Sequence, residues 1–372
     1  MKEIVLINQS TGFLMVDIAN AYATKYEKVV LITGKIQILE RPLDKNIEIS
    51  KIVSYNKKNS FSRIYSWIWG TIQIFWKLLI KYRKGDILFV TNPPLSYVSA
   101  LFLNRVYSVL IYDIYPDALK NIGISENHLI YKTWVLLNKR IYKRAKKIYT
   151  LSEGMATKLS QYVHKDSITV IPNWSGSEKI RPIPKNKNIF IKNKNIENKF
   201  IVLYSGNMGY THNVDVLVDV AKSLINEKNI IFLFIGDGKM KNELISKVKA
   251  ENLNNCLFLG WQDPDMLPFS LAAADLGVVT LNEETAYLSV PSKTYNLMAA
   301  GVALLSISPE NSALSDLIKS HQNGRNFSAD QVSEISNFIL YCRDNRDVLK
   351  KMSKKSFEAS KNYTFKNASF YV

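Results

Sequence analysis

Short apolar runs rich in β-branched residues alternate along this chain with longer segments in which apolar residues recur at helical spacing. In the first half, we predict strands near 2–8, 28–33, 86–91, 107–113, 147–151 and 168–171. The helices predicted between them lie near 15–25, 63–82, 95–104, 129–145 and 153–162. Such alternation predicts an α/β fold with a parallel sheet covered on both faces.

The same alternation restarts after residue 199. We predict strands at 200–205, 230–235, 256–259 and 276–281, with helices at 213–226, 239–251 and 266–274 and from 291 or 292 to 301. Successive strands run into turns that contain Gly206, Asn207 and Gly209, then Gly236 and Gly238, then Trp261 and Gln262. Because ligands of open α/β sheets gather at the carboxyl ends of the strands, we expect these loops to form a site.

A chain of 372 residues is too long for one compact core. A stretch rich in lysine and asparagine at 175–199 is typical of a linker. We therefore predict domains at 1–174 and 200–349, which suggests a cleft between them. The final residues, 350–372, contain five aromatic side chains in a helical pattern. We expect this helix to cross back to the first domain.

The basic residues are unevenly distributed. Residues 1–180 hold 26 Lys and Arg against 13 Asp and Glu, whereas the remainder holds 23 against 19. A basic half is typical of proteins that contact nucleic acid or an anionic membrane surface, although such clusters are also common on ordinary solvated faces. No nucleic-acid-reading module is recognisable, so that partner is the weakest hypothesis.

The segment 64–80 contains three tryptophans and is interrupted by Gln73 and Lys77. It is shorter than the roughly 20 apolar residues that a spanning helix needs. A helix lying in a membrane interface would fit this pattern, and a core helix would fit nearly as well. We favour the interfacial helix because the basic excess falls in the same half.

The two cysteines, Cys256 and Cys342, lie in apolar runs without metal-ligand spacing. We expect reduced, buried thiols and no metal. The first residues form a predicted strand and lack the pattern of a secretory signal. These features favour a cytoplasmic protein.

Three residues of the first half follow predicted strands. Gly12 ends the first strand, where glycine permits close backbone approach or simply makes a turn. Asp113 and Asp117 follow the fourth strand, and either could orient or deprotonate a hydroxyl. Asp117 could equally cap a helix. We favour Asp113 because it is nearer the strand end.

The stretch from Val278 to Gly301 combines a buried strand, a polar loop and a short helix that begins at Pro291 or Ser292. Backbone N–H groups at the start of this helix, the Ser292 hydroxyl and the Lys293 cation could together bind an anion. Our hypothesis is a diphosphate. An ordinary capped helix with a surface lysine is the alternative.

At this point the chain resembles a known family over nearly its whole length. The residues that carry the resemblance are 204–209 (YSGNMG), 235–238 (IGDG), 258–262 (FLGWQ), 273–279 (AADLGVV) and 289–301 (SVPSKTYNLMAAG), and more loosely 91–94 (TNPP) and 112–117 (YDIYPD). They are similar to the retaining group 1 glycosyltransferases, which include enzymes of capsule, O-antigen and exopolysaccharide synthesis. The resemblance implies a GT-B fold, in which two Rossmann-like domains face a central cleft.

The resemblance also implies a nucleotide-sugar donor held by the second domain, an acceptor held by the first, and no required metal or other cofactor. With it, we assign catalytic roles to Asp113, Lys293 and Glu284. The residues assigned to donor binding are Gly12, Gly206, Asn207, Gly209, Gly236, Gly238, Trp261, Gln262, Ser289, Val290, Pro291, Ser292 and Asn296.

The chain departs from the family pattern in the stretch that contains Lys293. Many members have two glutamates eight positions apart, and the corresponding residues here are Leu288 and Asn296. Asn296 can still bind a ribose hydroxyl. Because leucine cannot bind a sugar hydroxyl, we expect Glu283, Glu284 or the backbone to do so. Asn207 stands where members usually have a basic residue, with His212 nearby.

We therefore predict a retaining glycosyltransferase of bacterial surface polysaccharide synthesis. Its acceptor would be a saccharide, on a polyprenyl diphosphate or free, and the enzyme would lie at the inner face of the cell membrane. A nucleotide-sugar epimerase or hydrolase of the same fold, or a non-catalytic donor-binding subunit, remains as an alternative.

Overall fold

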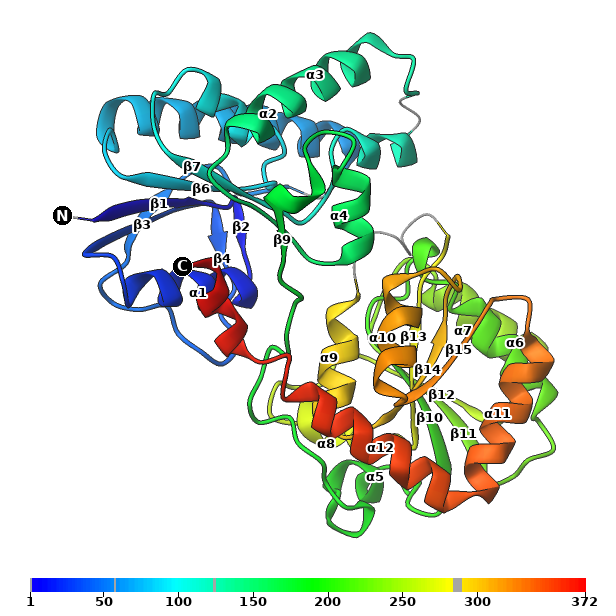
Figure 1. The fold of residues 1–372 in the computed structure, drawn as a ribbon. Coiled ribbons are helices and arrows are strands. Elements are labelled where there is room, and N and C mark those ends of the chain that lie inside the picture. Colours follow the sequence, from blue (N-terminus) through cyan, green and yellow to red (C-terminus); the bar gives the residue numbers. More distant parts are fainter. Residues whose placement is uncertain (1, 57, 123–124, 284–289) are drawn as a thin grey trace. The chain divides into compact units, whose positions relative to one another are not determined.

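The computed structural model describes residues 2–56, 58–122, 125–283 and 290–372 (Figure 1). The chain divides into two compact units. The first consists of Met1–Gly176 together with Phe365–Val372, and the second of Ser177–Thr364. Each is built on a parallel sheet, as the alternating pattern predicted.

The sheet of the first unit is parallel throughout its described pairings. Across the sheet, its strands are β5 (Glu48–Lys51), β3 (Lys28–Thr33), β1 (Glu3–Ile7), β6 (Asp86–Val90), β7 (Tyr107–Ile111), β8 (Ile148–Thr150) and β9 (Ile168–Val170). A second, two-stranded sheet pairs β2 (Ser10–Thr11) with β4 (Lys35–Ile36). The prediction missed β2, β4 and β5, because these strands are too short or too polar for an apolar run to mark them.

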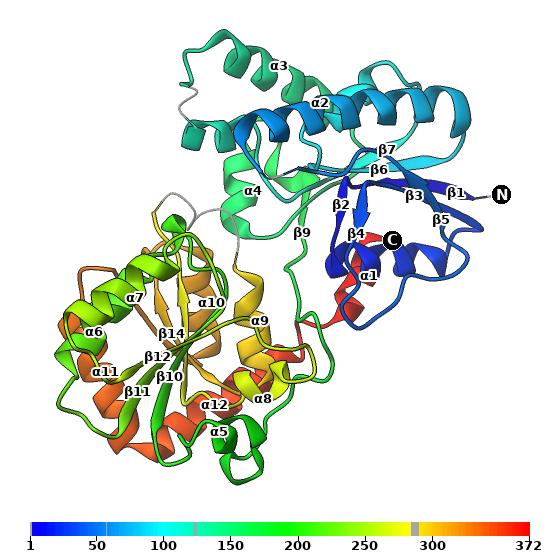
Figure 2. The ribbon, with the colours of Figure 1, turned by 180° about the vertical axis from the view of Figure 1, so that it is seen from behind.

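The helices of the first unit cover both faces of its sheet. They are α1 (Phe13–Ala23), α2 (Ser60–Trp76) with the π-helical turn η1 (Lys77–Lys81), the 3₁₀ segments η2 (Ser96–Leu101), η3 (Asp117–Ile122), η4 (Lys165–Ser167) and η7 (Phe365–Tyr371), α3 (Leu129–Arg144) and α4 (Glu153–Leu159). Figures 1 and 2 show α2 and α3 on one side of the sheet and α1 on the other. The helix expected at 95–104 is the 3₁₀ segment η2, because its backbone bonds join residues three apart, such as Val98 N–H to Leu95 C=O at 3.0 Å.

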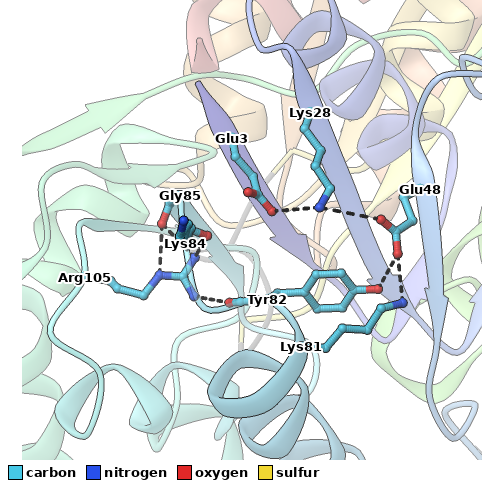
Figure 3. Close-up of polar contacts among 8 residues, drawn as sticks. All are labelled: Glu3, Lys28, Glu48, Lys81, Tyr82, Lys84, Gly85 and Arg105. Atoms are coloured by element: carbon cyan, nitrogen blue, oxygen red, sulfur yellow. Dashed lines mark hydrogen bonds and ion pairs between the residues drawn. The ribbon is translucent and has the colours of Figure 1, made fainter. Parts of the chain in front are cut away.

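Polar contacts fasten the end of η1 to the sheet (Figure 3). On β5, Glu48 accepts hydrogen bonds from the Tyr82 hydroxyl at 2.7 Å and from the Lys81 ammonium at 2.9 Å. Arg105 donates to the carbonyls of Tyr82, Lys84 and Gly85. The turn that follows η1 is therefore held by Glu48 of β5 and by Arg105.

The sheet of the second unit is also parallel in every described pairing. Its order is β12 (Cys256–Leu259), β11 (Ile230–Ile235), β10 (Phe200–Ser205), β13 (Leu276–Thr280), β14 (Ala303–Ile307) and β15 (Gly324–Phe327). Alternate residues of β10 belong to two different apolar clusters. Phe200, Val202 and Tyr204 pack in one cluster, and Ile201 and Leu203 in the other. This period of two places one cluster on each face of the sheet.

Helices cover the two faces of the second sheet. They are α5 (Ile189–Asn193), α6 (Asp215–Ser223), α7 (Lys241–Ala250), α8 (Leu267–Leu271), α9 (Ser292–Ala299), α10 (Ala313–His321), α11 (Val332–Asp344) and α12 (Arg346–Ser360), with the 3₁₀ segments η5 (Lys185–Lys187) and η6 (Tyr210–His212). Residues of α6, α7 and α11 pack in the cluster of Tyr204, whereas those of α5, α8, α9 and α10 pack in the cluster of Leu203.

The structure changes two of the expected boundaries. The stretch predicted as a linker at 175–199 belongs almost entirely to the second unit, because Phe190 and Ile191 of α5 are buried in its core. In the final stretch, α12 also belongs to the second unit, and its Arg346 donates to the Asp275 carboxylate at 2.8 Å. Only η7, with its neighbours from 365 to 372, returns to the first unit.

Candidate functional site

The candidate site of the second unit lies where the order of its strands reverses. From β10 the chain builds outward through β11 and β12, and then starts again on the other side of β10 with β13. The loops that follow β10 and β13 therefore diverge over the carboxyl edge of the sheet. In open α/β sheets such a switch point leaves a crevice in which ligands bind.

The turns after β10 and β11 are packed directly on one another. At Gly236 (φ +134°), a Cβ atom would lie 2.0 Å from the carbonyl oxygen of Gly206. At Gly238 (φ +153°), it would lie 2.3 Å from the carbonyl oxygen of Met208. Met208 N–H also donates to Asp237 C=O at 2.8 Å. Glycine at 236 and 238 is thus needed for this close packing, which holds the two turns as one platform.

Lys293 reaches this platform from the start of α9. Its Nζ atom lies 4.0 Å from the ring centroid of Tyr204 and 3.1 Å from where a Cβ of Gly206 would be. The residue is partly exposed, but Nζ itself is shielded and has no hydrogen-bond partner among the described residues. Burial lowers the pKa of Lys293 to about 7. A buried ammonium without a counter-ion is costly, so this group is prepared to take an anion.

Other polar groups near Lys293 are also buried without described partners. His212 Nδ1, Thr280 Oγ1 and Thr294 Oγ1 make no hydrogen bond within the part of the chain that the structure describes. Burial first, and then the charge of Lys293, lower the pKa of His212 to about 4. The imidazole is therefore neutral near pH 7 and can donate or accept one hydrogen bond at each nitrogen.

The amino end of α9 adds backbone donors. The helix begins at Ser292 after Pro291, and no described side chain caps it. The N–H groups of a first helical turn lack partners within the helix and carry the positive end of its dipole. The Ser292 side chain is exposed, and Val290 before it is buried. The start of α9 thus offers N–H donors, a hydroxyl and the Lys293 ammonium, as the sequence predicted.

Of the other predicted donor-binding residues, Asn207, Trp261, Gln262 and Asn296 lie at the same sheet edge. Asn207 is exposed, and its carbonyl accepts the Tyr204 hydroxyl at 2.7 Å. Trp261 follows the edge strand β12 and is 63% exposed, while Gln262 donates to Gly260 C=O at 2.8 Å. Asn296 lies one turn into α9. Glu284, Leu288 and Ser289 fall outside the described residues.

In the first unit, the strand order reverses between β1 and β6. Gly12 begins α1 after β2 with an ordinary extended backbone, and a Cβ there would meet nothing within 4 Å. The fold itself therefore does not require glycine at this position. Asp113 is exposed just past β7, and its N–H donates to the Thr91 hydroxyl at 3.2 Å. Asp117 accepts hydroxyl bonds from Tyr131 and Tyr162, so its contacts are structural.

Tyr204 and Thr280 are site residues that sequence reasoning missed. Each stands at or next to the end of its strand, β10 or β13, beside the reversal of strand order. Their position at the two strand ends was a usable signal once the order of the strands was known. For metal ions, the described residues contain no group of three or more His, Cys, Asp or Glu that could hold one.

Comparison with known proteins decides the family of the second unit. Residues 185–359 match the family model described as "Glycosyl transferases group 1". The second unit belongs to the group 1 glycosyltransferase family. Its match spans α5 to α12 and includes the platform and Lys293 of this glycosyltransferase unit.

Two curated proteins are similar to the chain. WbjE of Pseudomonas aeruginosa, named as a probable glycosyltransferase, is 26% identical over 278 residues, which are 73% of this chain and 69% of WbjE. WcaI of Escherichia coli (strain K12), named for glycosyl transfer in colanic acid biosynthesis, is 29% identical over 157 residues, which are 41% of this chain and 38% of WcaI.

Solved structures show the fold. Sucrose-phosphate synthase from Thermosynechococcus elongatus has a TM-score of 0.76 at 15% identity, covering 100% of this chain and 97% of that one. HepE from Anabaena, solved with UDP and glucose, has a TM-score of 0.74 at 15% identity, covering 100% and 98%. The chain has the GT-B fold that the sequence indicated.

Proposed function

We propose that this chain is a retaining glycosyltransferase that moves a sugar from a nucleoside-diphosphate sugar to a saccharide acceptor in the synthesis of a bacterial surface polysaccharide. The family of its second unit and its similarity to WbjE and WcaI support glycosyl transfer and this pathway class. We also propose an acceptor carried on polyprenyl diphosphate at the cytoplasmic face of the membrane. The free thiols Cys256 and Cys342 agree with a reducing compartment.

The Lys293 ammonium, which has no hydrogen-bond partner among the described residues, carries the proposal. A nucleoside diphosphate placed at the start of α9 would meet this cation, the N–H groups of the helix and the neutral His212. These donors would stabilise the charge that develops on the diphosphate as the sugar leaves. In other enzymes a divalent cation neutralises the charge of the departing diphosphate. In this chain the amino end of α9 and Lys293 would neutralise it.

The proposed reaction breaks the bond between the anomeric carbon and the diphosphate oxygen, and forms one from that carbon to the acceptor hydroxyl. The hydroxyl proton passes to an oxygen of the departing phosphate on the same face, so the anomeric configuration is retained. The first unit would hold the acceptor, with Asp113 orienting its hydroxyl. Glu283, Glu284 or the backbone would bind the transferred sugar, and Asn296 the ribose.

A donor screen tests this function. Sugars linked to UDP are tested first, because HepE of the same fold was solved with UDP and glucose. The full chain is incubated with a panel of nucleotide sugars, with and without a polyprenyl-diphosphate saccharide, and both product and free nucleotide are measured. We expect nucleotide release and product only when donor and acceptor are both present, with the anomeric configuration kept.

Three other outcomes would contradict the proposal. Conversion of the donor without an acceptor indicates an epimerase or a hydrolase. Nucleotide binding without turnover, relieved only by a partner protein, indicates a non-catalytic donor-binding subunit. A product of inverted configuration excludes the retaining reaction, since no double displacement or same-face attack gives it.

A further inference from the structure

Helix α2 turns some of its polar side chains toward the protein. Gln73 accepts the N–H of Val53 at 2.8 Å, and the Ser66 hydroxyl accepts the N–H of Asn56 at 3.2 Å. At Gly70 the helix lies so close to the Gln9 side chain that a Cβ would be 2.6 Å from its Nε2. Just after α2, Lys77 also turns inward and donates to the Ser50 hydroxyl. The inner side of this helix therefore combines small and polar residues with two apolar ones, Trp67 and the fully buried Ile74.

The outer side of α2 carries large apolar residues. Six exposed side chains, which we call the α2 stripe, follow each other at intervals of three, four or one: Phe61, Tyr65, Ile68, Trp69, Ile72 and Trp76. Trp69 and Trp76 are 45% and 53% exposed, and Phe61 is 81% exposed. Large exposed apolar patches on a folded protein mark a surface that binds a partner.

The three tryptophans of this segment take different positions. Trp67 turns inward, where its ring stacks on Tyr55 at a centroid distance of 5.8 Å and meets Tyr115 edge-on at 5.9 Å. Trp69 and Trp76 stay on the stripe. The helix predicted from the sequence to lie in a membrane interface included all three tryptophans. The structure leaves two of them on the outer face.

The charges around the stripe indicate its partner. Residues 51–84, which include α2 and η1, contain eight Lys and Arg, of which Lys77 turns inward, and no Asp or Glu. Residues 129–147, which include α3 on the same side of the sheet (Figures 1 and 2), contain seven Lys and Arg and no Asp or Glu. An apolar, tryptophan-bearing stripe among cations is complementary to an anionic lipid surface, where tryptophan lies at the headgroup level.

The length and attachment of α2 also agree with a bilayer surface. Helix α2 with η1 is about 30 Å long at 1.5 Å per residue, and its end is fixed to β5 through Glu48 and to the turn through Arg105 (Figure 3). In the described part of the chain, no helix is long and apolar enough to cross a membrane. A second copy of the chain is a poorer occupant, because it would bring the same cations against these ones.

We propose that the α2 stripe inserts into the headgroup region of an anionic bilayer, with Trp69 and Trp76 as its anchors. The helix lies parallel to the membrane plane, and the cations of the same side face the acidic headgroups. This inference does not depend on the proposed glycosyl transfer, because binding to lipid can be measured without turnover.

Vesicle sedimentation with the full chain tests the proposal. The probes are vesicles of phosphatidylcholine alone and of phosphatidylcholine with about 30% phosphatidylglycerol, at low salt. We expect binding to the anionic vesicles with a blue shift of tryptophan emission. The double variant Trp69→Ser with Trp76→Ser should bind about tenfold or more weakly and lose the shift. The variant Tyr341→Ser, an exposed aromatic on α11, is the matched control and should bind like the parent chain.

Thermal unfolding keeps this test independent of folding, because the exposed tryptophans should be replaceable without a change in melting temperature. Absence of binding to anionic vesicles at low salt would overturn the proposal. So would binding that is unaffected by the double tryptophan variant and abolished by salt alone, since that is adsorption by charge without insertion. Sedimentation equilibrium that shows a dimer broken by the same variant would assign the stripe to a second copy instead.

Discussion

The ammonium group of Lys293 lies 4.0 Å from the ring centroid of Tyr204, with no carboxylate in hydrogen-bond contact among the described residues. The two residues come from α9 and β10, which flank the point where the strand order reverses. A desolvated cation over an aromatic ring gains about 2 kcal/mol, which offsets only part of the cost of its burial. An anion that binds there can offset the remaining cost.

Replacing Lys293 by methionine should therefore separate stability from function. The variant loses a buried charge that has no partner in the described part of the chain, so its free energy of unfolding should rise by about 3 kcal/mol near pH 7. It also loses the counter-charge for the diphosphate, so kcat/KM should fall about 100-fold to 1,000-fold. Melting temperature and turnover measure the two effects. Lys239→Met, an exposed lysine of the adjoining loop, is the control and should change neither. Unchanged turnover in Lys293→Met would remove this group from the mechanism.

The affinity for a nucleoside diphosphate should fall as pH rises above 7. The pKa of Lys293 is lowered to about 7, well below the usual lysine value of about 10.4. An anion favours the charged form and raises this pKa again, so binding above pH 7 takes up a proton. Affinity should then drop by up to about tenfold per pH unit between 7 and 9. Calorimetry with UDP in buffers of different ionisation enthalpy measures the proton.

The same shift sets a stability trend of defined sign. Between about pH 7 and pH 10 the unfolded chain carries one more proton than the folded chain at Lys293. This group therefore makes the fold more stable as pH rises through that window. Comparison with Lys293→Met isolates the contribution of Lys293 to this pH dependence of stability. If UDP binding had the same pH dependence in the variant as in the parent chain, the pKa of about 7 could not belong to Lys293.

Alanine at Gly236 should destabilise the second unit by about 2–4 kcal/mol. Its φ of +134° is unfavourable for alanine, and the new methyl group would lie 2.0 Å from the carbonyl oxygen of Gly206. Gly260→Ala is the matched control, because Gly260 follows the neighbouring strand and a Cβ there meets nothing within 4 Å. Chemical denaturation should place the control within about 0.5 kcal/mol of the parent chain. Equal effects of the two substitutions would show that the turns are not packed as described.

Asparagine at Asp17 should destabilise the first unit by about 3 kcal/mol. The carboxylate is buried and accepts two hydrogen bonds from Arg41, each at 2.7 Å, and one from the Trp174 indole at 2.8 Å. Asparagine keeps one acceptor oxygen but removes the negative charge and the second acceptor that face the poorly solvated Arg41 guanidinium. Glu153→Gln breaks an exposed pair with Lys165 and should cost less than 1 kcal/mol. Denaturation monitored by tryptophan fluorescence compares the two variants, and equal losses would argue against a buried pair.

The pattern of the chain predicted six of the seven strands of the larger sheet in the first unit and four of the six strands in the second unit, where it missed β14 and β15. Strands such as β10 and β11, at 200–205 and 230–235, are continuous apolar runs because both faces of a parallel sheet are covered. Composition was misleading at 175–199, where lysine and asparagine surround the residues that pack in the core. Phe190 and Ile191 fill the core there, and Asn188 caps α5 with its side chain.

The site was predictable where function follows from a strand end or a helix start. The sequence placed Ser292 and Lys293 at the mouth of α9 without a structure. It could not show that Nζ of Lys293 is shielded, because this depends on Gly206 and Tyr204, nearly ninety residues earlier in the chain. Nor could it show which face of α2 is turned outward, because that helix has large apolar residues on its outer side while Gln73 lies on its inner side beside Ile74.

The return of η7 to the first unit affects the order in which the chain can fold during synthesis. The hydroxyls of Tyr22 and Tyr149 donate to the carbonyl of Tyr371 at 2.6 Å and 3.0 Å, and the Tyr371 ring is buried beside them. The ribosome makes every residue of the second unit before it reaches Tyr371. The synthesis of the first unit therefore begins first and ends last, and part of its core stays uncovered until Tyr371 has been made.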